Sequence, residues 1–224
     1  LLSLALSILF FFFIVHQKPQ ELQRKNIPRW LPLSRYIGVF ITAIFISWVH
    51  ISLTWIIFLI FGIVSLAKLV FEKTWLWREG LILSFASVIG WFLRPNPFGA
   101  IKLAYIQVVD LILQKQQEAT LLFGREIFPL APQTLFQNFS AFMILWFFAL
   151  VVLIILVKKH SNILKNVGML SSGLISIIFF ILTLTTARRS HDIWIPFGII
   201  FIALIYTNLL QHPHIFKNIR MFGF

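Results

Sequence analysis

The sequence predicts an all-α, polytopic transmembrane bundle of about seven spans, with one further amphipathic helix in the membrane interface. Its 224 residues are 59% hydrophobic and 12% charged, and they include 26 Phe and 8 Trp. A soluble domain of this size cannot bury so much apolar surface, and several apolar runs approach the ~20 residues that cross a bilayer. Lys and Arg give a net charge of +12. They fall in short loops between apolar runs, a pattern typical of membrane proteins, so we expect no nucleic-acid partner.

Seven apolar runs are the predicted spans, and they cover residues 1–15, two helices within 37–71, and residues 80–93, 139–157, 167–186 and 193–210. The run 37–71 is twice the length of one span. His50 and the polar residues after it predict a tight turn there, because one straight helix of ~35 residues would rise ~50 Å. One long tilted helix is the alternative.

The start of the chain bears on its domain organisation. Leu1 already lies in a hydrophobic run, without a basic segment or a small-residue cleavage site, and a cleavable signal peptide is the alternative. We therefore interpret residues 1–224 as a single transmembrane domain that lacks its N-terminal part. The sequence contains no Cys, which excludes disulfides, a thiolate nucleophile and Cys-based metal sites.

Polar segments separate the spans. Residues 16–35 form a predicted basic loop, which Pro28 and Pro32 keep partly non-helical. A second predicted loop carries the charged residues Lys68, Glu72, Lys73, Arg78 and Glu79. Later in the chain, two prolines and a glycine within residues 94–99 end the fourth predicted span.

An amphipathic helix is predicted over residues 99–117. One face carries Lys102, Gln107, Asp110, Gln114 and Gln117. The other face carries Ile101, Ala104, Tyr105, Val108, Val109 and Ile112. This division predicts a helix lying in the membrane interface. With a predicted loop over residues 118–138, it makes residues 99–138 one segment on the outer face.

The basic residues predict the orientation. Seven spans place 13 of the 19 Lys and Arg residues on one side and 6 on the other, so the richer side should be cytoplasmic. One long helix over 37–71 would give 11 and 8, a weaker separation. We therefore expect residues 94–138 and 187–192 on the outer face of a bacterial or archaeal plasma membrane.

A charged turn between the last two spans is the first candidate binding site. The forked guanidinium groups of Arg188 and Arg189 suit phosphate oxygens, although these side chains could instead reach to the interface with their stems in lipid. We expect Asp192 to pair with one of the arginines. His191 is a candidate proton carrier or phosphate donor, or a solvated loop histidine.

Three more polar residues are expected on the same face. Arg94 and Asn96 lie where the fourth predicted span breaks. Irregular backbone at membrane depth survives when it is buried in protein or lines a wet cavity, and a plain interfacial turn is the alternative. His50 lies in the predicted hairpin turn. No acidic pair for general-base catalysis, Ser/His/Asp signature, glycine-rich phosphate loop or HExxH motif is present, so the catalytic residues stay unknown.

Three segments of the chain resemble the GT-C class of polytopic membrane glycosyltransferases. Residues 45–54 resemble the aromatic–x–His–small turn of many members, residues 90–99 the glycine and proline segment that closes a later span, and residues 186–196 the arginine loop before a final helix. The resemblance implies transfer of a sugar from a polyprenyl-phosphate donor to an acceptor on the outer face. It also implies that Arg188, Arg189 and Arg94 grip the donor phosphate, although Arg94 stands where related sequences often carry His. The acidic catalytic motif of the class lies in its first outer loop, which we expect upstream of Leu1.

Two alternatives use the same residues differently. A transporter or flippase of anionic lipid-linked saccharides needs no outer acid, but mid-span charges would favour it and the predicted spans carry none. A non-catalytic membrane scaffold would tolerate substitution in the loops. The expected partners are membrane lipid and a polyprenyl-phosphate-linked sugar. No cofactor or metal site is evident, and a divalent cation cannot be assigned to any residue.

Overall fold

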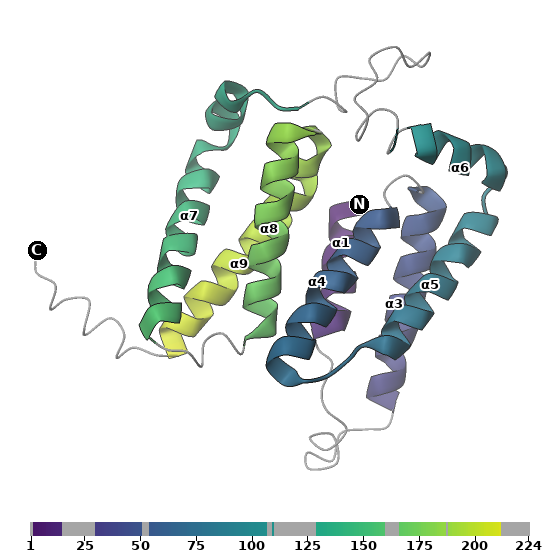
Figure 1. The fold of residues 1–224 in the computed structure, drawn as a ribbon, viewed down its shortest axis with the longest axis horizontal. Coiled ribbons are helices and arrows are strands. Elements are labelled where there is room, and N and C mark those ends of the chain that lie inside the picture. The colour runs from purple at the N-terminus through teal and green to yellow at the C-terminus, as the bar shows by residue number, and fades with distance from the viewer. Residues whose placement is uncertain are drawn as a thin grey trace, which may run out of the picture. The chain divides into compact units, whose positions relative to one another are not determined.

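The computed structural model describes residues 2–14, 30–50, 54–106, 109, 129–159, 166–186 and 188–211. These residues are helical, with short connecting turns and no strand among them, which confirms the all-α class (Figure 1). Four described segments are long and apolar enough to cross a membrane: Thr54–Glu72, Pro132–Val157, Val167–Thr185 and Arg188–Leu210. The protein is therefore an integral membrane protein, and the count of seven spans stays a prediction.

The chain divides into two compact units, Leu1–Phe128 and Pro129–Phe224, here called unit 1 and unit 2. Unit 1 contains α1 (Leu2–Ile14), α3 (Trp30–Val49), α4 (Thr54–Glu72), α5 (Trp77–Phe92) and α6 (Pro97–Tyr105). Unit 2 contains α7 (Pro132–Lys159), α8 (Val167–Thr185), the short 3-10 helix η5 (Arg188–Ser190) and α9 (His191–Gln211). Each unit is described by itself, and the expected single domain stays a prediction.

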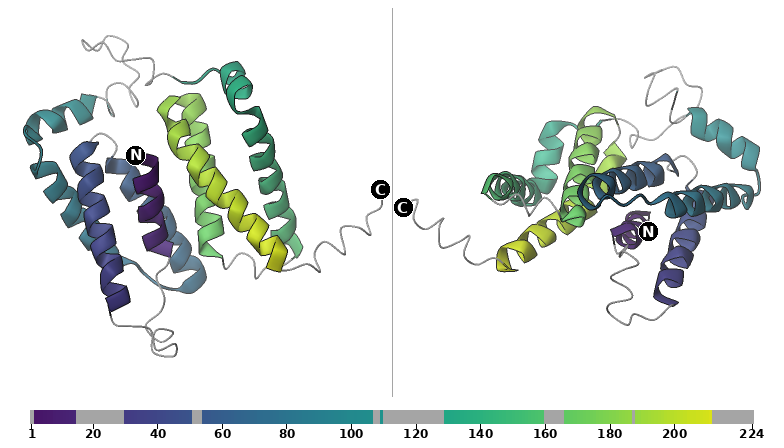
Figure 2. Two further views of the ribbon diagram at one scale, coloured as in Figure 1. Left: turned by 180° about the vertical axis from the view of Figure 1, so that it is seen from behind. Right: turned by 60° about the horizontal axis from the view of Figure 1, so that its bottom comes forward.

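In unit 1, α3 packs along α5, and α1 lies against both α3 and α4 (Figure 2). Helices α3 and α4 are separate, as the predicted turn near His50 requires, and one long helix over 37–71 is ruled out. Gly90 lets α5 approach α3 closely, because a Cβ atom at this position would lie 2.5 Å from the carbonyl oxygen of Ile44. The close contact runs beside the last turns of both helices, so α3 and α5 end at the same end of unit 1.

The buried residues of unit 1 recur at helical spacing. Those of α3 are Arg35, Val39, Ala43, Ile46 and Ser47. Those of α5 are Glu79, Leu83, Ala86, Ser87 and Gly90. Both stripes advance by three or four residues, apart from one adjacent pair in each, as expected for one face of a helix. Each stripe begins with a charged residue.

Unit 2 is built around α9, which packs along α8 and also against α7. Asn166 begins α8 by accepting a hydrogen bond from the backbone N–H of Met169 at 3.1 Å. Rings from three helices form the core, and the indoles of Trp146 and Trp194 lie 5.6 Å apart, nearly perpendicular. Phe139 leaves helical geometry with φ −130° and ψ 18°, so α7 bends there.

The structure corrects several predicted boundaries. The basic loop does not extend to Arg35, because α3 begins at Trp30. Pro32 is accommodated in the first turn of α3, where a helix needs no N–H donor. The charged loop shrinks to residues 73–76, since Lys68 and Glu72 belong to α4 and Glu79 to α5.

Two further corrections concern the predicted outer-face segment. The amphipathic helix begins at Pro97 rather than Gly99, and no residue of α6 is buried. Its interfacial position stays a prediction, and residues 107, 108 and 110–128 lie outside the described part of the chain. The predicted loop 118–138 is helical from Pro132 onward.

Candidate functional site

The charged turn of unit 2 lies between two helices that are long and apolar enough to cross a membrane. Helix α8 ends at Thr185, and Arg188 and Arg189 form η5 directly before α9. Arg189 and Asp192 are exposed, whereas Arg188 and His191 are half-buried. The turn therefore places two arginines directly before the N-terminus of a 21-residue helix. Free backbone N–H groups at such a terminus favour anions.

His191 organises the inner side of this turn. Its Nδ1 atom contacts the carbonyl oxygen of Arg188, and its Nε2 atom lies 3.3 Å from Oδ1 of Asp192. Its ring lies 5.4 Å from the ring of Phe139, at the bend of α7. Asp192 is thus placed beside His191, and its expected pairing with an arginine stays a prediction. The Phe139 ring therefore packs against the turn at His191.

Arg94 and Asn96 lie in the corner between α5 and α6. The Asn96 side chain accepts a hydrogen bond from the backbone N–H of Gly99 at 2.9 Å and so caps α6. The indole of Trp91 donates to the carbonyl oxygen of Pro97 at 2.7 Å and fixes the corner. The Nη1 atom of Arg94 is buried and has no hydrogen-bond partner among the described residues. Asn96 therefore has a structural task, and Arg94 keeps unused donor capacity.

His50 closes the last turn of α3. Its N–H donates to the carbonyl oxygen of Ile46 at 2.7 Å, and its own carbonyl oxygen accepts from the Thr54 hydroxyl at 3.5 Å. His50 and Arg94 share the end of unit 1 at which α3 and α5 finish. The turn of residues 188–192 belongs to unit 2. The structure thus gives two separate groups of predicted residues, and their convergence in one site stays a prediction.

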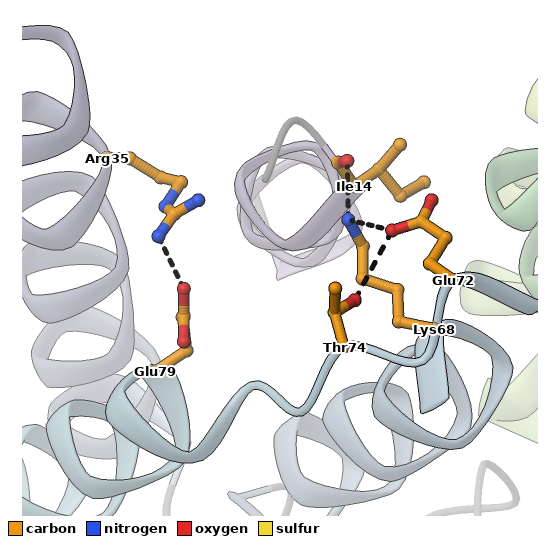
Figure 3. Close-up of polar contacts among 6 residues, drawn as sticks. All are labelled: Ile14, Arg35, Lys68, Glu72, Thr74 and Glu79. Carbon is orange, nitrogen blue, oxygen red and sulfur yellow. Dashed lines mark hydrogen bonds and ion pairs between the residues drawn. The ribbon is translucent and has the colours of Figure 1, made fainter. Parts of the chain in front are cut away.

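Sequence analysis missed a buried ionic cluster at the opposite end of unit 1. A guanidinium nitrogen of Arg35 in α3 donates to the carboxylate of Glu79 in α5, and the two side chains are only 10% and 3% exposed (Figure 3). Burying these charges together is tolerable because each neutralises the other. The pair thereby ties α3 to α5.

Lys68 makes the second half of this cluster. Its side chain is fully buried, and its Nζ atom donates to the carbonyl oxygen of Ile14, the last residue of α1, at 3.0 Å. The same atom lies 3.5 Å from the Glu72 carboxylate, which also accepts from the Thr74 hydroxyl at 3.4 Å (Figure 3). Lys68 therefore satisfies a free carbonyl at the end of α1 and ties α1 to α4.

The sequence does contain a signal for this cluster. Arg35, Lys68 and Glu79 each lie four residues from a buried apolar residue of the same helix, namely Val39, Val64 and Leu83. A charge on the buried register of a helix indicates an inward-facing side chain with a partner. All three residues fall in segments predicted to be loops, so the prediction did not show that each lies on the buried face of a helix.

The chain matches no family model, no curated protein and no solved structure. Within the described ranges, no three His, Asp or Glu side chains gather as a metal site requires. Chemical interpretation therefore starts from two features: the arginine turn before α9, and the buried ion pairs in unit 1.

Proposed function

We propose that the protein is a membrane glycosyltransferase that moves a sugar from a polyprenyl-phosphate donor to an acceptor on the outer face of the membrane. One observation carries the proposal. Arg188 and Arg189 form a short turn at the junction of two membrane-crossing segments, directly before the N-terminus of α9. Cations at that level suit a phosphate whose lipid chain stays in the bilayer.

The chemistry follows from this placement. As the bond between sugar and phosphate breaks, negative charge grows on the leaving phosphate and positive charge on the sugar. Fixed guanidinium groups stabilise the leaving phosphate and lower the barrier. A base takes the proton from the acceptor hydroxyl, and we leave this residue unassigned. Arg94, with its unused Nη1 donor, is the further candidate for holding the donor phosphate.

The proposal is tested by the double variant Arg188→Ala/Arg189→Ala of the full-length protein in nanodiscs. We expect it to bind polyprenyl monophosphate at least about tenfold more weakly, since each charge-assisted contact is worth roughly 1.5–3 kcal/mol. Sugar transfer from a panel of radiolabelled polyprenyl-phosphate sugars should be abolished. Binding is measured by native mass spectrometry against the uncharged polyprenol of the same length.

Lys102→Ala is the control. It removes an exposed cation of α6 in unit 1 that is assigned to neither proposed phosphate site. This control should keep the preference for polyprenyl monophosphate over polyprenol. Every variant should still insert into the membrane. Unchanged binding and transfer in the double variant would refute the proposal.

A second candidate is a transporter or flippase for anionic lipid-linked saccharides. The buried charges of unit 1 favour it, because ionisable groups inside membrane helices often mark transport pathways. They lie within the first or last two turns of their helices rather than at mid-span, which makes this the weaker candidate. Proteoliposomes separate the two: a flippase moves a fluorescent polyprenyl-phosphate sugar between leaflets without cleaving it. A scaffold does neither.

A further inference from the structure

The turn between α4 and α5 combines exposed indoles with exposed cations. Trp75 and Trp77 are 61% and 54% exposed, and Lys73 and Arg78 are exposed beside them. The guanidinium carbon of Arg78 lies 5.3 Å from the centre of the Trp77 ring. Apolar surface and positive charge therefore occur together within six residues, 73–78.

The charge of this turn is visible only in the structure. Residues 72–79 are formally neutral, because Glu72 and Glu79 balance Lys73 and Arg78. Both glutamates, however, are engaged by other cations: Glu79 pairs with Arg35, and Glu72 lies against Lys68 (Figure 3). Within the described ranges, Lys73 and Arg78 form no ion pair. The outward surface of the turn is thus positive.

The length of α4 sets the depth of this turn in the membrane. Its 19 residues rise roughly 28 Å, close to the ~30 Å of a bilayer's hydrocarbon core. Lys73 follows at once with φ 53°, a left-handed conformation that ends the helix. Residues 73–78 therefore fall at the level of the lipid headgroups. Indole rings favour that level, and cations there attract anionic lipids.

We propose that residues 73–78 bind the headgroup of an anionic phospholipid, on the face that the charge distribution predicts to be cytoplasmic. Lys73 and Arg78 contact the headgroup phosphate, and Trp75 and Trp77 lie at the ester level beside it. The buried cluster contributes indirectly, because its cations Arg35 and Lys68 balance the charge of both neighbouring carboxylates. This site is independent of the proposed glycosyl transfer.

The test uses the absence of native cysteine. Thr74→Cys introduces the only thiol of the 224 residues, and a fluorophore there reports on the turn alone. The labelled chain is placed in phosphatidylcholine nanodiscs with a trace of headgroup-quencher lipid, either phosphatidylglycerol or phosphatidylcholine. We expect stronger quenching by phosphatidylglycerol at equal mole fraction. Lys73→Gln/Arg78→Gln should remove this preference, a loss on the order of tenfold.

Lys102→Gln is the matched control, because it removes an exposed cation of α6 in the same unit and should preserve the lipid preference that the fluorophore at position 74 reports. If the labelled variant does not fold, native mass spectrometry of the unlabelled protein replaces the quenching measurement. It counts the phosphatidylglycerol molecules that stay bound to each chain. Equal quenching by the two lipids, or a preference that survives Lys73→Gln/Arg78→Gln, would overturn the proposal. Either result would assign the surface to a protein partner instead.

Discussion

The two units hold their helices together by different means. In unit 1, charged side chains are buried between helices: Arg35 pairs with Glu79, and Lys68 reaches the end of α1. In the described part of unit 2, the buried polar residues carry only hydroxyl groups, and the charged side chains of known exposure lie at the turn before α9. Aromatic rings fill the core of unit 2 instead.

Buried ion pairs depend on the direction and charge of two groups, whereas packed aromatic rings depend on how well their volumes fit. A buried hydroxyl can donate to its own helix, as Ser176 does to the carbonyl oxygen of Gly173 at 2.7 Å and Thr183 to that of Phe179 at 2.7 Å. A buried charge needs a partner, and here each contacts another helix: Arg35 pairs with Glu79, and Lys68 donates to the carbonyl oxygen of Ile14. We therefore expect unit 1 to be sensitive to loss of charge, and unit 2 to changes in ring and side-chain volume.

The largest expected effect is that of Glu79→Ala. It leaves the Arg35 guanidinium buried without its carboxylate partner, which should lower the free energy of unfolding by about 3 kcal/mol. The double variant Arg35→Met/Glu79→Leu should recover most of this loss, because apolar side chains of similar volume can replace a buried pair. Reversible unfolding in mixed detergent and SDS micelles measures both values.

Arg78→Ala is the control for this prediction. Arg78 is exposed and forms no ion pair within the described ranges, so its removal should cost about 1 kcal/mol or less. Equal losses for Arg78→Ala and Glu79→Ala would show that burial does not determine the cost. The contrast between the two units would then be wrong.

Glycine substitutions give an intermediate effect and compare the packing of the units. A Cβ atom at Gly90 in unit 1 would lie 2.5 Å from the backbone carbonyl oxygen of Ile44, which cannot move without its helix. At Gly198 in unit 2 it would lie 2.6 Å from Cζ of Phe142 and 3.2 Å from Cδ1 of Trp146, and the half-buried Phe142 side chain can tilt away. Gly90→Ala should therefore cost about 2 kcal/mol and Gly198→Ala about 1 kcal/mol or less.

Gly62 in α4 supplies the baseline for this series. No atom lies within 4 Å of a Cβ added there, so Gly62→Ala should be neutral or stabilise by up to about 1 kcal/mol through helix propensity. The same unfolding measurement serves all three variants. A loss at Gly198 as large as that at Gly90 would mean that the rings of unit 2 are as rigid as backbone.

The helices of this protein could largely be predicted from its sequence. Apolar runs locate α4, α7, α8 and α9 within a few residues, apart from the first turns of α7, because the length and hydropathy of a span are local properties. The turn near His50 was predictable for the same reason, since ~35 apolar residues exceed one span. Charge alone also drew attention to Arg188 and Arg189, and the structure does place them on an exposed turn.

The pairing of charges could not be predicted in the same way. Whether Glu79 faces lipid, solvent or Arg35 depends on how α5 is rotated against α3, and Gly90 contributes to that rotation from the other end of α5. The zero formal charge of residues 72–79 also fails to predict a positive surface, because Glu72 and Glu79 pair with cations elsewhere in the chain. Local composition largely predicts whether a segment is a loop or a helix. The partner of a buried charge depends on tertiary packing, which local composition does not show.

The smallest expected effect compares two neighbouring tryptophans of unit 2. The indole N–H of Trp146 donates to the Ser176 hydroxyl at 3.0 Å, whereas the buried N–H of Trp194 has no partner within the described ranges. Trp146→Phe loses a hydrogen bond together with ring area. Trp194→Phe loses similar area but removes an unsatisfied donor. Trp146→Phe should therefore cost about 1 kcal/mol more than Trp194→Phe.

The sign of this difference tests whether Trp194 stabilises unit 2 through its ring alone. If Trp194→Phe costs as much as Trp146→Phe, the Trp194 N–H must have a partner that the described residues do not supply. Unit 2 would then depend on a second directional polar contact, besides that between Trp146 and Ser176. If Trp194→Phe is nearly neutral, the ring of Trp194 acts by its volume, and the unsatisfied donor is tolerated because the surrounding rings hold the indole in place.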